Sequence, residues 1–523
     1  MKDILEVLKE NFGNSWKVIE ESTCRLYILI PKEGMGKILP VITKIFQMRL
    51  VFIFAADDRK EKGAFGVYYV FSYEREDKFL IIETRVEEKQ PSFLSATRFL
   101  PQANWFEREI HDLFGLIPQG HPDPRPLVLH EDWPKGIFPL RKDFKWEKVP
   151  RTKGDYLFDQ VEGEGVFEIP VGPVHAGIIE PGHFRFSSAG ESILKLEIRH
   201  FYTHKGTEKL GEGKTPLHLL CLAERISGDN SLAHAAACVQ ALEALSNTAV
   251  PYRAQFLRTI FLELERLHNH ISDIAGISLD VAFSFGASQL MRLKERLLQL
   301  NERLGGTRLL RSVIIPGGVK KDLKEEEIKF ILREIKEIKD DFEKTIKILF
   351  QINSLLDRIE LTGVINKEIA EVLGAVGPTA RASGIDRDLR RDHPYAAYSH
   401  LSFIVPVFLE GDVESRMKVK IQEVYESSQL ICEALTAMPP GPVKGEVKVM
   451  PVSKNAFGYA ESPRGECFHW ISTDHEGKIS RWKIHSPSFV NWPLIQYAVL
   501  ENIIPDFPLI NKSLNLSYSG NDR

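Results

Sequence analysis

Cysteine is scarce in this chain of 523 residues, and its spacing does not favour a metal centre. No two of the five form a Cys-x-x-Cys pair: they are Cys24, Cys221, Cys238, Cys432 and Cys467. We therefore expect neither a structural zinc ion nor an iron–sulfur cluster in this chain. Isolated cysteines in a long chain are typical of a reducing cytoplasm, where they pack as small apolar side chains.

Further absences narrow the possible functions. No apolar run approaches the roughly 18–20 residues that span a membrane, so we expect membrane contact only through partner subunits. The net charge of −4 provides no basic surface for phosphates, so nucleic acid is not an expected partner. The segment MKDILEVLKENFG is charged and amphipathic, unlike a secretory signal. A phosphate-binding Gly-rich loop, a dinucleotide fingerprint and a His-Glu-x-x-His motif are all missing, so NAD, ATP and zinc-hydrolase chemistry have no support here.

The length and the patterning predict an α+β protein of two domains. Residues 1–145 read as a small α+β domain in which a helical start precedes the β-rich segments CRLYILIP, RLVFIFAAD, GAFGVYYVFSY and KFLIIETRVE. That order is typical of helices packed on a mainly antiparallel sheet. Residues 146–166 are polar and contain glycine, which favours a linker. Residues 167–523 form the second domain.

The second domain is predicted to be mainly helical. Apolar residues recur at helical spacing over about 215–245, 251–305, 323–360 and 412–437. In the third region they form one stripe amid Lys and Glu, which predicts a helix with one buried face: Ile328, Ile331, Ile335, Ile338, Phe342, Ile346 and Leu349. From Val443 onward the pattern returns to strand-like and irregular segments.

Two motifs carry acids and histidines. The segment GPVHAGIIEPGHFRF places Glu180 on a Pro-Gly turn close to His175 and His183, which on its own is an ordinary hairpin-like turn. The helical pair Glu265-x-x-His268 is half of a di-iron carboxylate motif. A second helical copy is missing, so we expect a buried polar network between helices instead.

Two other segments carry arginine. Residues 376–395 alternate charges of both signs in a Gly-containing stretch, which suits either an interior polar seam or a solvated loop. Arg464 lies between Pro463 and Gly465, and an arginine in such a turn often binds an anion or carboxylate. An ordinary structural ion pair fits this pattern equally well.

Taken together, these segments resemble two protein families on one chain. Residues 104–144, with EREIHDLFGL, GHPDPRP and PLRKDF, resemble the small hydrophilic C subunit of respiratory complex I. Residues 167–523 resemble the large subunit of membrane-bound [NiFe] hydrogenases and the D subunit of complex I. The fused order is most similar to the formate hydrogenlyase and hydrogenase-4 type. The resemblance runs through GPVHAGIIEPGHFRF, FYTHKGTEKL, LELERLHNH, VGPTARASG, RRDHPYAAY, AESPRGECFHW and SLNLSYSGNDR.

The chain departs from this resemblance at the metal ligands. In those hydrogenases two Cys-x-x-Cys pairs hold nickel and iron, and the matching positions here are Ser227, Asn230, Ser517 and Gly520. A hydroxyl, a carboxamide and a glycine do not replace thiolates. We therefore expect no [NiFe] centre, no metal and no other cofactor in this chain, and no hydrogen activation by it.

The resemblance also bears on quinone binding. The D subunit of complex I holds the quinone with a histidine and a tyrosine, and the matching positions here are Ile179 and Gly228. A quinone site of that kind is therefore not expected. The chain is also expected to carry no tail for removal after nickel insertion.

Part of the hydrogenase machinery has matching residues. Glu180 matches the carboxylate that passes protons from a metal-bound cysteine, Arg464 matches the arginine beside the metals, and Asp392 belongs to a segment near the same cavity. With His234, these residues are our candidate proton-transfer and cavity residues, because buried carboxylates beside arginine often have perturbed pKa values.

The resemblance implies the large subunit of a complex I-like, hydrogenase-related oxidoreductase complex that couples electron transfer to ion translocation. The expected partners are an iron–sulfur small subunit, a ferredoxin-like subunit and antiporter-like membrane subunits, with iron–sulfur clusters in the partners. The expected location is peripheral, on the cytoplasmic face of the membrane. The alternatives are an NADH- or quinone-linked dehydrogenase subunit with a rebuilt acceptor site, a non-catalytic scaffold subunit, and an oxygen-ligand metal site formed by Ser227, Asp229, Asn515 and Asp522.

Overall fold

A computed structural model describes residues 2–13, 15–150, 152–177 and 179–523. Arg151 of the predicted linker and Ile178 of the Glu180 segment lie outside the described residues. The chain forms two compact units. Unit 1 comprises Met1–Asp159, Arg199–Phe201 and Val372–Gly374, and unit 2 comprises Gln160–Ile198, Tyr202–Glu371 and Ala375–Arg523. The boundaries at 145 and 167 stay a prediction.

Unit 1 is built on a five-stranded sheet with the order β1-β2-β5-β4-β3. The pair β2–β5 is parallel and the other pairs are antiparallel, as expected from the β-rich segments. Nearly every residue of β3 and β4 is buried, because their apolar runs leave no polar face. The strands and helices are β1 (Lys17–Glu21), β2 (Arg25–Leu29), β3 (Arg49–Ala56), β4 (Phe65–Tyr73), β5 (Lys78–Val86), β6 (Ser92–Leu94), β7 (Ile117–Gln119), α1 (Lys2–Phe12), α2 (Met35–Pro40), α3 (Arg59–Lys62) and α4 (Asn104–Phe114).

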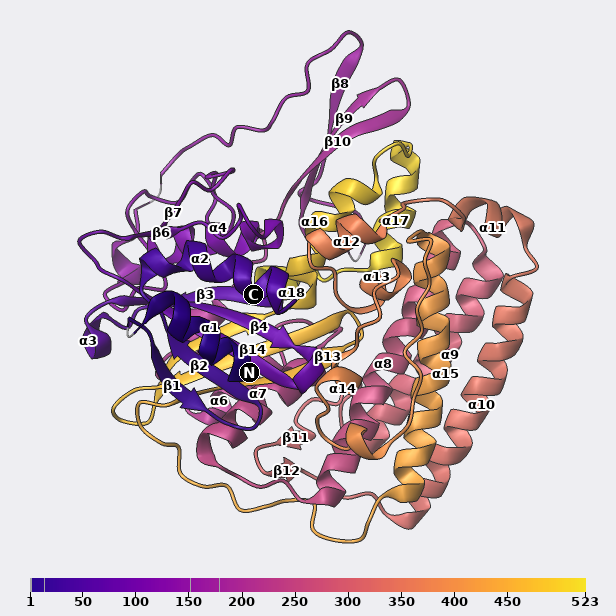
Figure 1. Cartoon of the computed structure of the whole chain (residues 1–523). Coiled ribbons are helices and arrows are strands. Elements are labelled where there is room, and N and C mark those ends of the chain that lie inside the picture. The colour runs from indigo at the N-terminus through magenta and orange to yellow at the C-terminus, as the bar shows by residue number, and fades with distance from the viewer. Residues whose placement is uncertain (1, 14, 151, 178) are drawn as a thin grey trace. The chain divides into compact units, whose positions relative to one another are not determined.

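Four long helices of unit 2 pack side by side (Figure 1): α8 (Tyr252–Asp280), α9 (Ser284–Gly305), α10 (Glu325–Leu349) and α15 (Val413–Ala437). The predicted apolar stripe of α10 is buried from Ile331 to Leu349, whereas its Lys and Glu side chains face solvent. Helix α8 is buried along most of its length, so its polar residues must find partners inside the protein.

Beside these helices, α7 (Ser231–Ser246) packs on the antiparallel sheet β13 (Asn455–Ser462), β14 (Gly465–Thr473) and β15 (Ile479–His485). Cys238 and Leu242 of α7 meet Ile471, Trp482 and Ile484 in a common core. The remaining elements are β8 (Val166–Val171), β9 (His183–Ala189), β10 (Ser192–Arg199), β11 (Ile314–Ile315), β12 (Gly318–Val319), α5 (Thr207–Leu210), α6 (Pro216–Ala223), α11 (Asn353–Ile359), α12 (Lys367–Val372), α13 (Gly377–Ala382), α14 (Leu389–Asp392), α16 (Pro487–Ala498), α17 (Phe507–Leu514) and α18 (Tyr518–Asp522).

The α+β class is confirmed. Three of the predicted helical regions each contain two helices: 251–305 holds α8 and α9, 323–360 holds α10 and α11, and 215–245 holds α6 and α7, which residues 224–230 separate. That interruption carries Ser227 and Asn230. In the part of the chain that the structure describes, no helix combines the length and the apolar character needed to cross a membrane.

Candidate functional site

The four positions that match metal ligands lie on two segments, which we call the paired loops: residues 224–230, between α6 and α7, and residues 515–523, which include the short helix α18. Lys205 joins them: its backbone N–H donates to the carbonyl of Arg523, and its Nζ donates to the carbonyl of Ile226, both at 2.9 Å. Positions almost 300 residues apart in the sequence are thereby tied through one residue.

Arg464 forms the charged centre next to the paired loops. Pro463 and Arg464 make the two-residue turn between β13 and β14. The Nη1 and Nη2 atoms of Arg464 donate to the carboxylate of Asp273 at 2.6 and 3.0 Å, and its Nε lies 3.4 Å from Asp229. The turn fits because Gly377, at φ 65°, carries no side chain: a Cβ there would lie 2.4 Å from the carbonyl oxygen of Arg464.

Asp273 is fully buried on α8, and its carboxylate contacts two further groups in addition to Arg464. Nζ of Lys420 lies 2.8 Å from its Oδ2, and Nδ2 of Asn515 donates to its Oδ1 at 2.5 Å. Burial raises the pKa of Asp273, but Arg464 and Lys420 outweigh burial and hold the pKa at about 2. Burial lowers the pKa of Lys420 to about 8. Asp273 therefore remains an anion between two cations.

The two predicted carboxylates lie in different surroundings. The half-buried Glu180 accepts the backbone N–H of Ser519 at 2.9 Å, which places it on the second paired loop. Asp392 instead forms local bonds, accepting from the backbone N–H of Asp388 at 2.9 Å and from Nε of Arg391 at 2.8 Å. The structure therefore ties Glu180 and Arg464 to the paired loops, whereas the hydrogen bonds of Asp392 hold the turn that begins α14.

His234 belongs to a buried chain of three rings. Trp482 donates its indole N–H to Nδ1 of His469 at 3.1 Å, and Nε2 of His469 lies 2.9 Å from Nδ1 of His234. Because a neutral imidazole has one donor and one acceptor, Nε2 of His469 donates and Nδ1 of His234 accepts. Burial lowers the pKa of His234 to about 3, so the ring is neutral and carries its proton on Nε2. His234 thus presents a hydrogen-bond donor rather than a base.

Several buried polar atoms around the paired loops have no hydrogen-bond partner among the described residues. They include Oγ of Ser227, both amide atoms of Asn230, Nε2 of His234, Oγ of Ser486 and Oδ1 of Asn521. Such groups are rare in folded proteins because each one costs about 1–3 kcal/mol. The simplest way to satisfy them is ordered water or a small polar molecule.

The residues on the paired loops do not fit a [NiFe] centre. Oγ of Ser517 accepts the backbone N–H of Gly520 at 3.0 Å, and a Cβ built on Gly520 would lie 2.9 Å from that oxygen. Gly520 itself has no side-chain donor, and none of the described residues of the paired loops is a cysteine that could supply a thiolate. Within the described ranges, no group of three or more His, Cys, Asp or Glu side chains converges to hold a metal ion.

The oxygen-ligand alternative is likewise unsupported, because both of its carboxylates, Asp229 and Asp522, are engaged elsewhere. Asp522 accepts from the backbone N–H and the hydroxyl of Thr203, at 2.9 and 2.7 Å. Asp229 lies against Arg464, and Asn515 donates to Asp273.

The other motifs have structural roles. Glu265 accepts the backbone N–H groups of Leu232 and Ala233 at the start of α7, as expected for a buried polar network rather than half of a di-iron site. Residues 376–395 contain both an interior polar seam and a solvated part, the two possibilities that the sequence left open. Arg381, Asp388 and Arg390 are an interior seam, whereas Asp386 pairs with Arg391 at the surface.

Sequence reasoning missed Asp273, Lys420 and His469 as site residues. Asp273 is the one charged residue of α8 between Ile271 and Ile277, which is a recognisable signal for a buried ion pair. Its partner Arg464 lies 191 residues further along the chain, so spacing offered no clue. The two histidines are similarly remote from each other.

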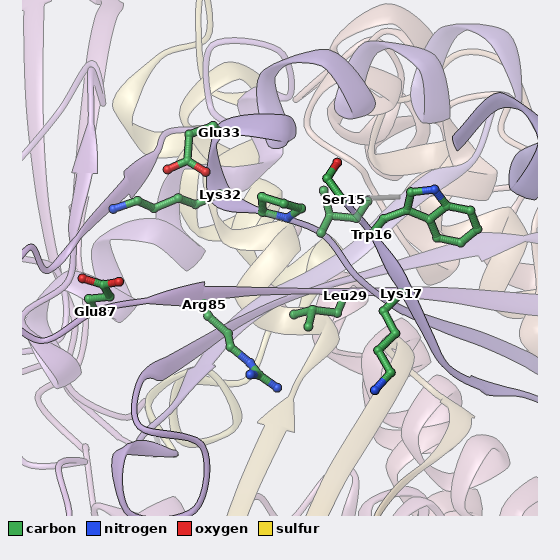
Figure 2. Close-up of a pocket in the computed structure, with 10 residues that line it drawn as sticks. Ser15, Trp16, Lys17, Leu29, Lys32, Glu33, Arg85 and Glu87 are labelled. Atoms are coloured by element: carbon green, nitrogen blue, oxygen red, sulfur yellow. The ribbon is translucent and has the colours of Figure 1, made fainter. Parts of the chain in front are cut away.

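A separate surface cavity of about 360 Å³ lies in unit 1 (Figure 2). Its charged lining consists of Lys17, Lys32, Arg85, Glu33 and Glu87, placed around Leu29. Cations and carboxylates nearly balance there, so the cavity does not present the single-sign field that attracts a charged ligand. It contains none of the predicted site residues.

Comparison with known proteins matches both parts of the chain. The family described as respiratory-chain NADH dehydrogenase, 49 Kd subunit, matches residues 280–457 and 446–523, and the 30 Kd subunit family matches residues 28–150. Formate hydrogenlyase subunit 5 of Escherichia coli (strain K12) is 35% identical over 481 residues, covering 91% of this chain and 84% of that protein. Hydrogenase-4 component G of the same organism is 34% identical over 480 residues, with the same coverage.

Among solved structures, a chain of the membrane-bound sulfane sulfur reductase, described as an archaeal respiratory membrane complex, is similar with a TM-score of 0.65 and 27% identity. The similarity covers 69% of this chain and 99% of that chain. The protein therefore belongs to the family of hydrogenase-related large subunits that join a 30 kDa-type and a 49 kDa-type segment of respiratory NADH dehydrogenase on one chain.

Proposed function

We propose that this chain is the large subunit of a membrane-associated, complex I-like oxidoreductase complex that works without a [NiFe] centre and couples electron transfer to ion translocation. The observation that carries the proposal is at the paired loops. All four metal-ligand positions hold residues that cannot act as thiolates, while the half-buried carboxylate of Glu180 bonds to the second loop.

In this proposal the paired loops hold water or a small polar acceptor instead of metals. The unpartnered atoms of Ser227, Asn230 and His234 supply donors and acceptors for such a molecule. Glu180 takes up or releases a proton at the second loop, and Arg464 supplies fixed positive charge. Asp392 is the second candidate carboxylate, positioned by Asp388 and Arg391.

The relatives support the assignment to a complex, because they are named as components of formate hydrogenlyase and hydrogenase-4 and the structural relative is a respiratory membrane complex. The partners we propose are an iron–sulfur small subunit, a ferredoxin-like subunit and antiporter-like membrane subunits. The chain would then lie peripherally on the cytoplasmic face of the membrane, with the iron–sulfur clusters in its partners.

Purification through a tag on this chain tests the assignment. We expect co-purification of iron–sulfur and integral membrane subunits, iron in the complex and no stoichiometric nickel by mass spectrometry of the elements. One nickel per chain, or hydrogen evolution from reduced viologen by the complex, would contradict the proposal.

The role of Glu180 is tested in membrane vesicles that contain the complex. Reductant-driven ion transport should fall at least roughly tenfold in Glu180→Gln, an effect expected when a proton-transfer group is lost. Glu191→Gln is the matched control, because Glu191 is an exposed carboxylate at the turn between β9 and β10 of the same segment. Equal transport by the two variants would refute a proton-transfer role for Glu180.

Assays in the same vesicles distinguish the proposal from a quinone-linked subunit and from a scaffold subunit. A quinone-linked subunit with a rebuilt acceptor site predicts quinone reduction, although Ile179 and Gly228 offer no side-chain hydrogen bond to a quinone. A scaffold subunit predicts that Glu180→Gln leaves electron transfer and ion transport unchanged.

A further inference from the structure

Unit 2 contains a second polar cluster, buried between α8, α13, α14, α15 and β13. Its seven charged side chains are each at most 3% exposed: Glu263, Asp388, Glu423, Glu461, Arg266, Arg381 and Arg390. We call this set the buried seven. Moving so many charges out of water requires close compensation within the set.

The arginines bind the carboxylates unevenly. Arg390 lies 2.7 Å from Asp388 and 3.1 Å from Glu263. Arg381 contacts Glu423, lies 3.3 Å from Asp388 and lies 3.2 Å from Glu461. Three of the carboxylates thus have multiple cationic contacts, because Arg266 also lies 3.3 Å from Glu263 and 3.4 Å from Glu423.

Glu461 is the least stabilised anion. Its carboxylate has one arginine contact and accepts one weak bond, at 3.3 Å, from the backbone N–H of Leu389. Glu263, by comparison, also accepts from the hydroxyls of Tyr398 and Ser427, both at 2.5 Å. Of the four carboxylates, Glu461 gains least from being charged.

The charges of the buried seven do not balance, because four carboxylates face three guanidinium groups. His270 lies 2.7 Å from Glu423, but burial lowers its pKa to about 4, so it adds no positive charge at neutral pH. On the adjacent strand β14, Glu466 is directly opposite Glu461 and is itself an acid. The hydroxyl of Tyr395 accepts the backbone N–H of Glu461 at 2.9 Å. Like His270, Tyr395 is neutral and adds no positive charge. A buried excess charge of this kind is normally removed by binding a proton.

The pKa shifts of the four carboxylates agree with one excess negative charge. Burial and the Asp388 carboxylate raise the pKa of Glu461 to about 8. For Glu263, Asp388 and Glu423, burial is outweighed by the neighbouring arginines, which keep the pKa of each below its usual value.

A cavity lies next to the cluster, although none of the buried seven lines it. This cavity of about 200 Å³ is lined by polar groups that include Gln240, Gln255 and Tyr459, which are only partly buried, and by Tyr395. Because Tyr395 also bonds to the backbone of Glu461, one residue spans from the cavity to the cluster. A polar cavity of this size holds several waters.

We propose that the buried seven form a binding site for a single proton, which resides on Glu461 and exchanges with water in the cavity beside Tyr395. Hydronium gives its proton to the carboxylate and leaves as water, so the step needs no oxidant or reductant. This site is separate from the proposed function of the paired loops and is tested without it.

The test is chemical denaturation of the full chain across pH, comparing wild type with Glu461→Gln. The native state of the wild type holds a proton that the unfolded state releases above about pH 4.5, so its stability must fall as pH rises toward about 8. This one group raises the unfolding constant about tenfold per pH unit in that window. Glu265, whose pKa burial raises to about 8, contributes with the same sign. The difference between wild type and variant therefore isolates Glu461.

Glutamine closely resembles a protonated glutamate, so Glu461→Gln should fold, should change the unfolding constant less than about tenfold near pH 6, and should lack this part of the pH slope. The matched control is Glu243→Gln, which removes a buried carboxylate from a balanced one-to-one pair with Arg258 (2.6 Å) at the same cavity. It should raise the unfolding constant roughly a hundredfold or more, because it leaves a buried cation unpaired.

Infrared difference spectra give a second readout: near pH 6, both proteins should show the protonated-carboxyl band of Glu265, and the wild type should show a further such band that Glu461→Gln lacks. If Glu461→Gln were as unstable as Glu243→Gln, or failed to fold, Glu461 would be an anion in the wild type. That result would overturn the proposal. Identical infrared spectra, or a charged His270 in nitrogen NMR spectra, would overturn it as well.

Discussion

Replacing Asp273 by asparagine tests how the charged centre beside the paired loops is held. The variant loses the fully buried anion that faces both Arg464 and Lys420. Asp229 remains 3.4 Å from Nε of Arg464, but its side chain is 22% exposed. Breaking a buried ion pair from one partner costs about 3–5 kcal/mol, and we expect Asp273→Asn to lower the free energy of unfolding by that amount.

The loss of stability in Asp273→Asn should become smaller as pH rises. Burial lowers the pKa of Lys420 to about 8, and the Asp273 carboxylate keeps it from falling further. In Asp273→Asn the pKa of Lys420 therefore drops below its wild-type value. The native variant then binds fewer protons than its unfolded state from that lower pKa up to about pH 10.5, a wider range of pH than in the wild type. Its stability must rise with pH through that range. The gap to wild type should be larger near pH 6 than near pH 9.

Urea denaturation of the full chain at both pH values measures these differences. Asp340→Asn is the control, since Asp340 is an exposed residue of α10 and should change stability by no more than about 0.5 kcal/mol. Adding Lys420→Met to Asp273→Asn should recover part of the loss, because one unpaired cation is removed. A cost below about 1 kcal/mol near pH 6, or a gap that does not change with pH, would refute the reasoning.

Two further predictions concern the rings and the second paired loop. His234 should stay neutral, with its proton on Nε2, from about pH 5 to about pH 9, because burial lowers its pKa to about 3; nitrogen NMR of histidine-labelled protein checks this, and an imidazolium signal would contradict it. Gly520→Ala should lower the free energy of unfolding by about 1–3 kcal/mol, because its Cβ would meet Oγ of Ser517 at 2.9 Å. Denaturation in a Ser517→Ala background, which lacks that oxygen, should show a smaller cost, and an equal cost would argue against the contact.

Local patterns predicted much of the fold. The isoleucine stripe of α10 shows one face only, so the helix and its buried side could both be read from the sequence. The break between α6 and α7 could have been predicted as well, because Ser227-Gly228-Asp229-Asn230 contains turn and helix-start residues. Strand β1 was missed because it is an edge strand with no fully buried residue.

The site was predictable only where it resembles a known family. Arg464 and Glu180 were named from such motifs, and the structure ties both to the paired loops. Asp273 and Lys420 carry no local motif, and their importance arises from burial and from contacts between positions far apart in the sequence. Electrostatic compensation of this kind depends on three-dimensional proximity, which spacing in a single sequence does not encode.

The persistence of Arg464 beside loops without thiolates does not by itself reveal a function. Arg464 is 4% exposed and is paired with a fully buried carboxylate, so replacing it alone would leave Asp273 with less compensation and would destabilise the fold whether or not the site works. Its presence is therefore explained by folding.

Glu180 differs, because it is half-buried and its one described hydrogen bond, to Ser519, contributes about 0.5–1.5 kcal/mol. Folding can tolerate glutamine at this position. Loss of ion transport in Glu180→Gln, in a protein that unfolds like the wild type, would consequently report on the reaction itself, whereas the same loss in an Arg464 variant would not distinguish function from stability.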